Sequence, residues 1–157
     1  MEKREMRVIF RQVVSILICA AVAGFAINLV HPKGYDFVSR ENNKMEKTIS
    51  ITAGEAYIKH IHGAAVFVDT RDDDVYQESH IKGAVNVPSF PEPLSIEKIG
   101  AMKQTLFSDK ELVLYCDTGC DSAKEIAVRL YARGYVRHIY ILKDGMGGWN
   151  DKGYPTE

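Results

Sequence analysis

A cysteine stands at the point where a predicted strand gives way to a predicted helix. Cys116 follows the apolar run 112–115, and a short loop leads from it into a helical pattern that begins at Ser122. The first turn of a helix has free backbone N–H groups and the positive end of the helix dipole, which together stabilise a thiolate. Because the thiolate is the nucleophilic form of cysteine, this arrangement predicts that Cys116 is reactive.

The residues around this cysteine predict a tight, well-defined loop. Gly119 gives the backbone freedom in the middle of the loop, and Ser122 with Glu125 forms the pattern of a capping box, which fixes where a helix begins. The alternative is that Cys116 is a small buried side chain without chemistry, as many free cysteines are. The loop and the cap favour the reactive interpretation.

A second thiol lies in the same loop. Cys120 follows Cys116 by four positions, and a curled loop can bring two such residues within reach of a disulfide. One interpretation is a redox pair in which Cys120 resolves an oxidised or sulfur-bearing Cys116; the other is that Cys120 packs between sheet and helix. A metal site formed by these thiols with Asp117 and Asp121 is disfavoured because no histidine is near. The sequence predicts no metal and no cofactor.

The segments that must position Cys116 alternate between strand and helix patterns. Strands are predicted at 49–51, 65–69, 84–87, 112–115 and 138–142, and helices after Thr52 and over 72–79, 95–106 and 122–133. Such alternation predicts an α/β fold, with a parallel sheet covered by helices on both faces. Ligands of open sheets of this kind bind beyond the carboxyl ends of the strands. Cys116 lies at such an end.

Three blocks of sequence resemble the signatures of rhodanese-like sulfurtransferase domains. They are the stretch 116–124, the run 68–71 with 76–88, and the run 142–149 with 153–155. The blocks occur in the order found in that family and cover most of residues 45–157. The resemblance implies a rhodanese-like parallel sheet of about five strands with helices on both faces.

The resemblance also implies an activity. The protein is expected to be a sulfurtransferase that carries sulfane sulfur as a persulfide on Cys116 and passes it to a thiol acceptor. The expected partners are a small sulfane-sulfur donor and a thiol acceptor, which is a small molecule or a protein. Asp69 and Arg71 are expected to support the site. The residues expected to form the substrate-binding loop are Asp117, Thr118, Gly119, Cys120, Asp121 and Ser122.

The loop departs from the family pattern in its charge. Many rhodanese-like loops carry a basic residue five positions after the cysteine, where it can bind thiosulfate, but this chain has Asp121 there. Together with Asp117 it would disfavour a thiolate and repel an anion, so thiosulfate is a doubtful donor. Two alternative functions stay open: a thiol–disulfide redox protein that uses Cys116 and Cys120, and a catalytically silent binding module on the same fold.

Charge is divided unevenly along the 157 residues. Residues 1–44 hold 7 Lys or Arg and 4 Asp or Glu, whereas residues 45–157 hold 13 and 17. The C-terminal part is therefore acidic and offers no broad basic surface for nucleic acid. The length fits one domain with an added segment.

Residues 12–30 form a run of 19 residues without a charge. A helix of this length spans roughly the 30 Å hydrocarbon core of a bilayer, which predicts a single-pass anchor in the cell membrane. Basic residues precede the run at positions 3, 4, 7 and 11, so the N-terminus is predicted to be cytoplasmic and the catalytic domain periplasmic. The alternative is a signal peptide whose cleavage releases the domain into the periplasm.

These predictions divide the chain into four segments. They are a cytoplasmic N-terminus over 1–11, a transmembrane anchor or signal segment over 12–30, a linker over 31–47 and the rhodanese-like domain over 48–157. The linker is predicted because Pro32, Gly34 and the polar residues around them show no period. One transmembrane helix would thus precede an α/β domain.

Overall fold

The computed structural model describes residues 3–30 and 48–157, with side chains in the first range described from 7 to 23. The chain divides into two compact units, residues 1–40 and residues 41–157. The predicted linker over 31–47 lies outside the described residues.

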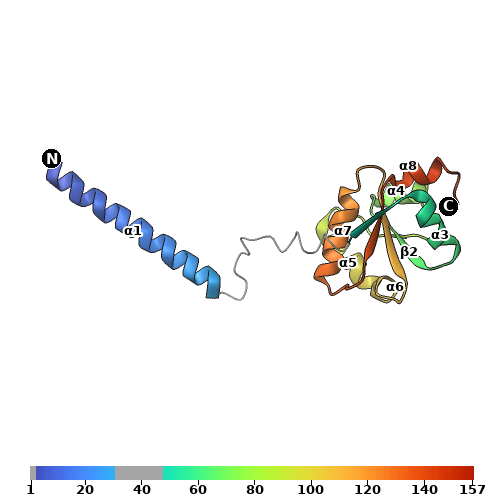
Figure 1. Ribbon diagram of the computed structural model, residues 1–157, viewed down its shortest axis with the longest axis horizontal. Helices are drawn as coiled ribbons and strands as arrows, with labels where there is room; N and C mark the ends of the chain where they lie inside the picture. Colours follow the sequence, from blue (N-terminus) through green and yellow to red (C-terminus); the bar gives the residue numbers. More distant parts are fainter. Residues whose placement is uncertain (1–2, 31–47) are drawn as a thin grey trace. The chain divides into compact units, whose positions relative to one another are not determined.

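The N-terminal unit contains one helix, α1 (Lys3–Val30) (Figure 1). The uncharged run 12–30 is therefore helical, as predicted. Among the described residues, however, no helix is long and apolar enough to cross a membrane, so the predicted transmembrane helix is not supported by the structure.

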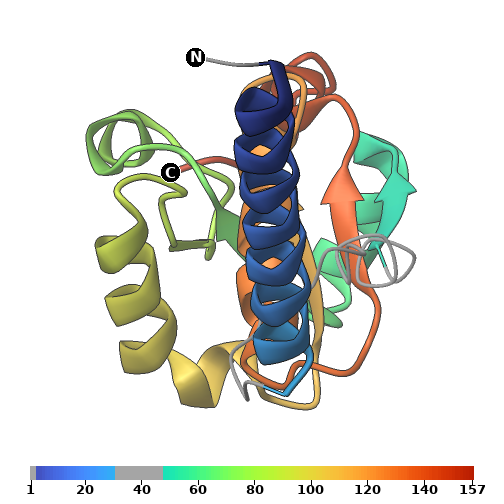
Figure 2. The ribbon, with the colours of Figure 1, turned by 90° about the vertical axis from the view of Figure 1, so that its left-hand side faces the viewer.

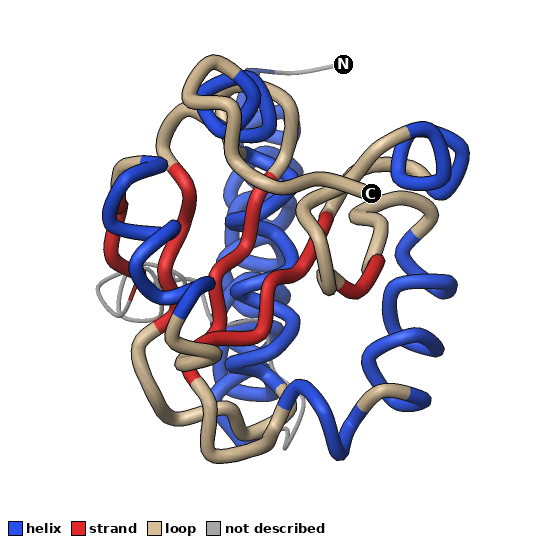
Figure 3. Tube along the Cα trace, turned by 90° about the vertical axis from the view of Figure 1, so that its right-hand side faces the viewer, coloured by secondary structure: helices blue, strands red, loops and turns tan. Residues whose placement is uncertain are grey.

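The globular unit is built on a five-stranded parallel sheet with the order β1-β5-β4-β2-β3. Figure 3 shows the strands side by side through this unit. The strands are β1 (Thr48–Ile51), β2 (Ala65–Asp69), β3 (Val85–Asn86), β4 (Glu111–Tyr115) and β5 (Ile139–Leu142). The helices are α3 (Ala53–Ile61), α4 (Asp73–Glu78), α5 (Glu92–Ala101), α6 (Lys103–Leu106), α7 (Asp121–Ala132) and α8 (Gly145–Asn150). The predicted parallel sheet of about five strands is confirmed.

Alternate side chains of β4 supply two separate cores, because successive residues of a strand point to opposite faces of a sheet. Leu112 and Leu114 pack in a cluster with side chains of α5, α6 and α7. Val113 and Tyr115 pack in a second cluster with side chains of α3 and α8, including Trp149. Helices therefore cover both faces, and β4, buried on both sides, is the central strand on which the cysteine loop is built.

One predicted helix is wrong in its extent. The pattern over 95–106 predicts a single helix, whereas the structure has α5 and α6 separated at Met102, whose φ of −98° and ψ of 20° interrupt the helix; Figure 2 shows these two helices, in yellow, at an angle to each other. The start is also earlier than predicted. Ser95 lies inside α5, where its buried hydroxyl donates a hydrogen bond to the carbonyl of Pro88.

Parallel pairing brings three strand ends to one edge of the sheet. Asp69 at the end of β2 pairs with Tyr115 at the end of β4, and Leu114 pairs with Ile141 near the end of β5. The residues that follow these strands are therefore neighbours, although they are far apart in the sequence. This edge holds the candidate functional site.

Candidate functional site in the loop after the central strand

Cys116 is the first residue after β4, and its sulfur faces the inside of the following loop. The Sγ atom accepts a hydrogen bond from the backbone N–H of Cys120 at 3.1 Å and donates to the carbonyl of Thr118 at 3.5 Å. The residue is only 4% exposed. An N–H group aimed at this sulfur stabilises negative charge on it, which suits a thiolate or a persulfide anion.

The loop curls around the sulfur because two successive residues adopt the left-handed conformation. Gly119 has φ +75° and Cys120 has φ +58°. Glycine takes this conformation at little cost, but for a cysteine it is uncommon. The turn directs the N–H of Cys120 at Cys116. Among the described hydrogen bonds of the loop, this N–H is the backbone donor to the sulfur.

The predicted capping box of α7 is wrong. The helix begins at Asp121, and its N-cap is Cys120, which makes no side-chain capping bond. Ser122 lies within the first turn, where its hydroxyl bonds to Thr70 Oγ1 at 2.9 Å. Thr70 in turn donates to the carbonyl of Tyr115 at 2.9 Å, so Ser122 is the donor in the hydroxyl pair. Ser122 thus ties the helix start to the end of β2 instead of capping the helix.

Cys120 is directed away from solvent, toward the end of β5. Its thiol donates to the carbonyl of Leu142 at 3.0 Å. Burial, together with the neighbouring Cys116, raises the pKa of Cys120 to about 12, so its side chain is a protonated thiol at neutral pH. All three cysteines of the chain, including Cys19, are free. This geometry matches the packing interpretation of Cys120.

Asp69 and Arg71 form a buried ion pair beneath the loop. Arg71 Nη2 lies 2.6 Å from Asp69 Oδ2, and Arg71 Nε contacts both carboxylate oxygens. Burial acts to lower the pKa of Arg71, but the hydrogen bonds and charge of Asp69 outweigh it and raise that pKa. The same guanidinium also donates to the Ser79 carbonyl at 2.7 Å and to Asp117 at 3.1 Å. Arg71 therefore connects the loop to two other segments.

The two loop carboxylates each have a basic partner. Asp117 is paired with Arg71, and Asp121, whose side chain is 90% exposed, is paired with Lys124 at 2.9 Å. Exposed pairs of this kind are weak individually, yet they place a positive charge beside each carboxylate. The repulsion of anions expected from Asp117 and Asp121 is therefore offset locally.

The loop packs against the start of α8 through a glycine. Gly145 has φ +56°, and a Cβ atom at this position would clash with the carbonyl oxygens of Cys116 and Asp117. Directly after it, the N–H of Met146 donates to the carbonyl of Cys116 at 2.7 Å. The absence of a side chain at 145 is thus what allows α8 to support the backbone of Cys116.

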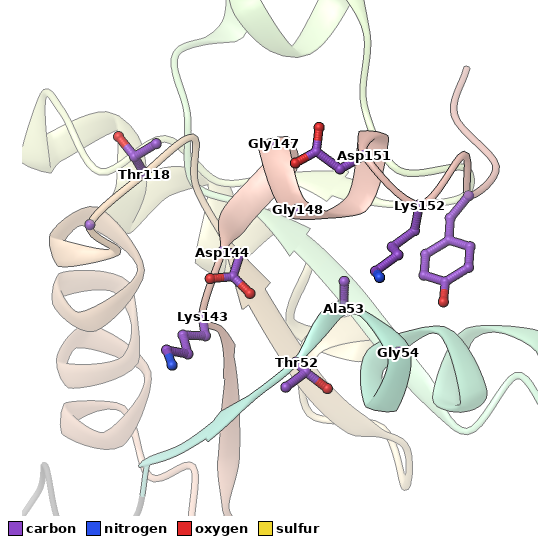
Figure 4. A pocket seen from close by; sticks show the side chains of 12 residues that line it. Thr52, Ala53, Gly54, Thr118, Lys143, Asp144, Gly147, Gly148, Asp151 and Lys152 are labelled. Atoms are coloured by element: carbon purple, nitrogen blue, oxygen red, sulfur yellow. The ribbon is translucent and has the colours of Figure 1, made fainter.

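A cleft of about 980 Å³ opens beside the loop (Figure 4). Thr118 and Gly119 line one side of it, while the start of α3 and the segment from Lys143 to Lys152 line the rest. Cys116 is not part of the lining, but it lies two residues from Thr118. A molecule in the cleft would therefore lie next to the loop that holds the sulfur.

The structure brings the predicted site residues together at one edge of the sheet, and it adds two that the sequence analysis missed. Thr70 lies between the predicted residues Asp69 and Arg71, so its position after a buried strand was a usable signal. Gly145 follows the last strand, as glycine often does at a tight turn, but its contact with the Cys116 carbonyl depends on packing between distant segments.

The globular unit is a parallel α/β domain. Its candidate nucleophile is a buried cysteine in a curled loop between the central strand and a helix. The sequence model described as "Rhodanese-like domain" matches residues 53–152. The chain belongs to this family.

Similar proteins carry different names. The chain is 32% identical over 108 residues to an HTH-type transcriptional regulator of Mycobacterium tuberculosis, an alignment that spans 69% of this chain and 44% of the regulator. It is 29% identical over 105 residues to the protein YibN of Escherichia coli, covering 67% of this chain and 69% of that protein. The chain thus spans less than half of the mycobacterial relative.

Solved structures show the same fold. The rhodanese-like domain of an Anabaena protein has a TM-score of 0.56 at 23% identity, over 69% of this chain and 77% of that one. A thiosulfate sulfurtransferase from Pseudomonas aeruginosa has a TM-score of 0.58 at 22% identity, over 74% of this chain and 22% of that one. At these identities the likeness establishes a rhodanese-like, sulfurtransferase-type fold.

We expect Gly145→Ala to destabilise the globular unit by about 2–4 kcal/mol, because it adds a clash with the cysteine loop to the strain of a left-handed alanine. Gly153→Ala is the matched control: Gly153 also has a positive φ, of +64°, but open space around it, and we expect a cost of about 1 kcal/mol. Denaturant unfolding followed by the fluorescence of Trp149, the single tryptophan, measures both. Equal costs would contradict the packing argument.

We expect the two loop thiols to differ in alkylation. Iodoacetamide reacts with thiolates, and a pKa of about 12 leaves Cys120 almost entirely protonated at pH 8. Cys120 should therefore react at least about tenfold more slowly than Cys116, and its labelling should rise as the pH approaches 12. Peptide mapping by mass spectrometry reads both sites, and denatured protein, in which both react alike, is the control. Similar rates in the native protein at pH 8 would show that Cys120 is not held as a thiol.

Proposed function

We propose that the protein is a sulfurtransferase that carries sulfane sulfur as a persulfide on Cys116 and passes it to a thiol acceptor. The observation that carries this proposal is the contact between the Cys120 N–H and Cys116 Sγ, which offers an anion-stabilising group to the sulfur at the end of the central strand. Membership of the rhodanese-like family supports it. The fold of a thiosulfate sulfurtransferase, shared at the level of architecture, supports it as well.

The reaction has two displacement steps. The Cys116 thiolate attacks the sulfane sulfur of the donor, a new S–S bond forms on Cys116, and the donor remainder leaves with the electron pair of the broken bond. An acceptor thiolate then attacks the outer sulfur, and Cys116 leaves as a thiolate. The N–H of Cys120 lies against Cys116 Sγ, so it would stabilise the thiolate at the start and end of this cycle.

The persulfide of a small thiol, which carries less negative charge than the thiosulfate dianion, is the better-suited donor under this proposal. Asp121 occupies the position where a basic residue would bind a dianion, and Lys124 is already paired with it. The pair offsets the negative charge but leaves no free cation at that position. Donors that do not need a cation in the loop are therefore favoured.

The redox alternative is less well supported by the geometry. A resolving thiol must attack as a thiolate. The Cys120 thiol, however, donates a hydrogen bond to the Leu142 carbonyl, and its pKa is raised. The silent binding module is the remaining alternative, and it predicts that Cys116 takes up no sulfur.

We expect the protein to gain one sulfur atom on Cys116 when it is incubated with the persulfide of a small thiol, and Cys116→Ser to abolish this gain. Intact-mass measurement followed by peptide mapping detects the added sulfur, and thiosulfate, tested in parallel, should load the protein more slowly. Cys19→Ser serves as the matched control, because Cys19 is an exposed thiol in α1 and its loss should leave loading unchanged. Sulfur found only on Cys120, or no loading of the folded protein, would overturn the proposal.

The cellular location remains a prediction from the sequence. The basic residues before position 12 and the uncharged run 12–30 support the proposal that the N-terminal segment holds the domain at the periplasmic side of the cell membrane. The protein should then stay in the membrane fraction after a high-salt wash, and a protease added on the periplasmic side should remove residues 48–157. A soluble mature chain beginning near Gly24 would instead establish cleavage of a signal peptide.

A further inference from the structure

The cleft beside the cysteine loop has the position and size of a binding site for a reaction partner. Its volume of about 980 Å³ lies at the upper end of the range for small-molecule pockets. Thr118 and Gly119 form part of its wall, and the carbonyl of Thr118 lies 3.5 Å from Cys116 Sγ. The residue that lines the cleft therefore also contacts the sulfur.

Four charged side chains line this cleft, two basic and two acidic. They are Lys143, Asp144, Asp151 and Lys152. All four are exposed, and within the part of the chain that the structure describes none of them forms a salt bridge. The charges on the cysteine loop itself, by contrast, are paired with Arg71 and Lys124.

The unpaired charges are distributed across the cleft instead of gathering by sign. Figure 4 shows Asp144 and Lys152 on opposite sides of Ala53, with the Lys143 side chain extending toward α7 and Asp151 at the far end of α8. A molecule with charges of one sign would be attracted by two of these groups and repelled by the other two. A molecule with a positive and a negative group can satisfy both kinds.

We propose that this cleft binds the thiol acceptor and that the acceptor is a zwitterion of amino-acid or dipeptide type. Its carboxylate would lie toward Lys143 or Lys152, and its ammonium toward Asp144 or Asp151. This inference rests on the proposed sulfurtransferase function. The acceptor thiol loses its proton to solvent and attacks the outer sulfur of the Cys116 persulfide; an S–S bond forms in the acceptor, and the bond to Cys116 breaks as Cys116 leaves as a thiolate.

The test compares two acceptors of similar size on the full-length protein after its Cys116 has been loaded from the persulfide of a small thiol. Cysteinylglycine carries both charges, whereas N-acetylcysteine amide carries neither. Compared at equal thiolate concentration, the second-order rate of sulfur release should be about tenfold higher for cysteinylglycine, since two exposed charge contacts contribute about threefold each. The double variant Lys143→Ala/Lys152→Ala removes the carboxylate contact alone, so it should reduce this advantage from about tenfold to about threefold and leave the rate with N-acetylcysteine amide unchanged.

Lys110→Ala is the matched control, because Lys110 is exposed and lies just before the opposite, amino-terminal end of β4. It should leave both rates unchanged. Equal rates for the two acceptors in the unmodified protein would overturn the inference, as would an equal loss for both acceptors in the double variant, or a loss in Lys110→Ala as large as that in the double variant.

A binding measurement separates this inference from the proposed function. The S-methyl derivative of cysteinylglycine cannot accept sulfur, so calorimetric titration of the unloaded protein reports the cleft alone. Binding of this probe that weakens in the lysine double variant but not in Lys110→Ala supports the proposed binding site in the cleft. If Cys116 then never takes up sulfur, only the sulfurtransferase function fails. Loading of Cys116 without any binding of this probe would overturn the cleft proposal and leave the function standing.

Discussion

The guanidinium of Arg71 is the interaction on which the arrangement of the site depends. It is nearly buried, and it reaches the end of β2 through Asp69, the cysteine loop through Asp117 and the segment after α4 through the Ser79 carbonyl. A buried charge is tolerated only when its partners are in place, and removing the buried partner Asp69 would cost about 3–5 kcal/mol. These three segments must therefore fold together.

Other contacts hold the loop from different sides. The hydroxyl chain from Ser122 through Thr70 to the Tyr115 carbonyl joins the start of α7 to the ends of two strands, and the Met146 N–H fixes the carbonyl of Cys116 from α8. Each of these contacts joins residues that lie far apart in the sequence. The conformation of Cys116 is thus a property of the assembled sheet edge, not of the loop sequence alone.

The difference between local contacts and contacts between distant segments explains which predictions succeeded. Strands such as 112–115 could be predicted because a short apolar run carries its own signal. The helix predicted after Thr52 begins there because the Thr52–Glu55 capping box that starts α3 is made of local bonds. The capping box predicted at Ser122 was wrong for two reasons. Cys120 adopts the left-handed conformation, and the Ser122 hydroxyl forms a hydrogen bond with Thr70, which is distant in sequence. The cleft could not be predicted, because its walls come from the cysteine loop, the start of α3 and the segment 143–154, which only the folded packing brings together.

The pair of left-handed residues at Gly119 and Cys120 has a kinetic consequence. These residues hold the Cys120 N–H on the sulfur, so the backbone of the loop itself organises the polar environment of Cys116. A cysteine that alternates between two covalent states in a ping-pong cycle would then have the same hydrogen-bond donor in both half-reactions. Differences between the two half-reaction rates would reflect the leaving groups and the entry of each substrate.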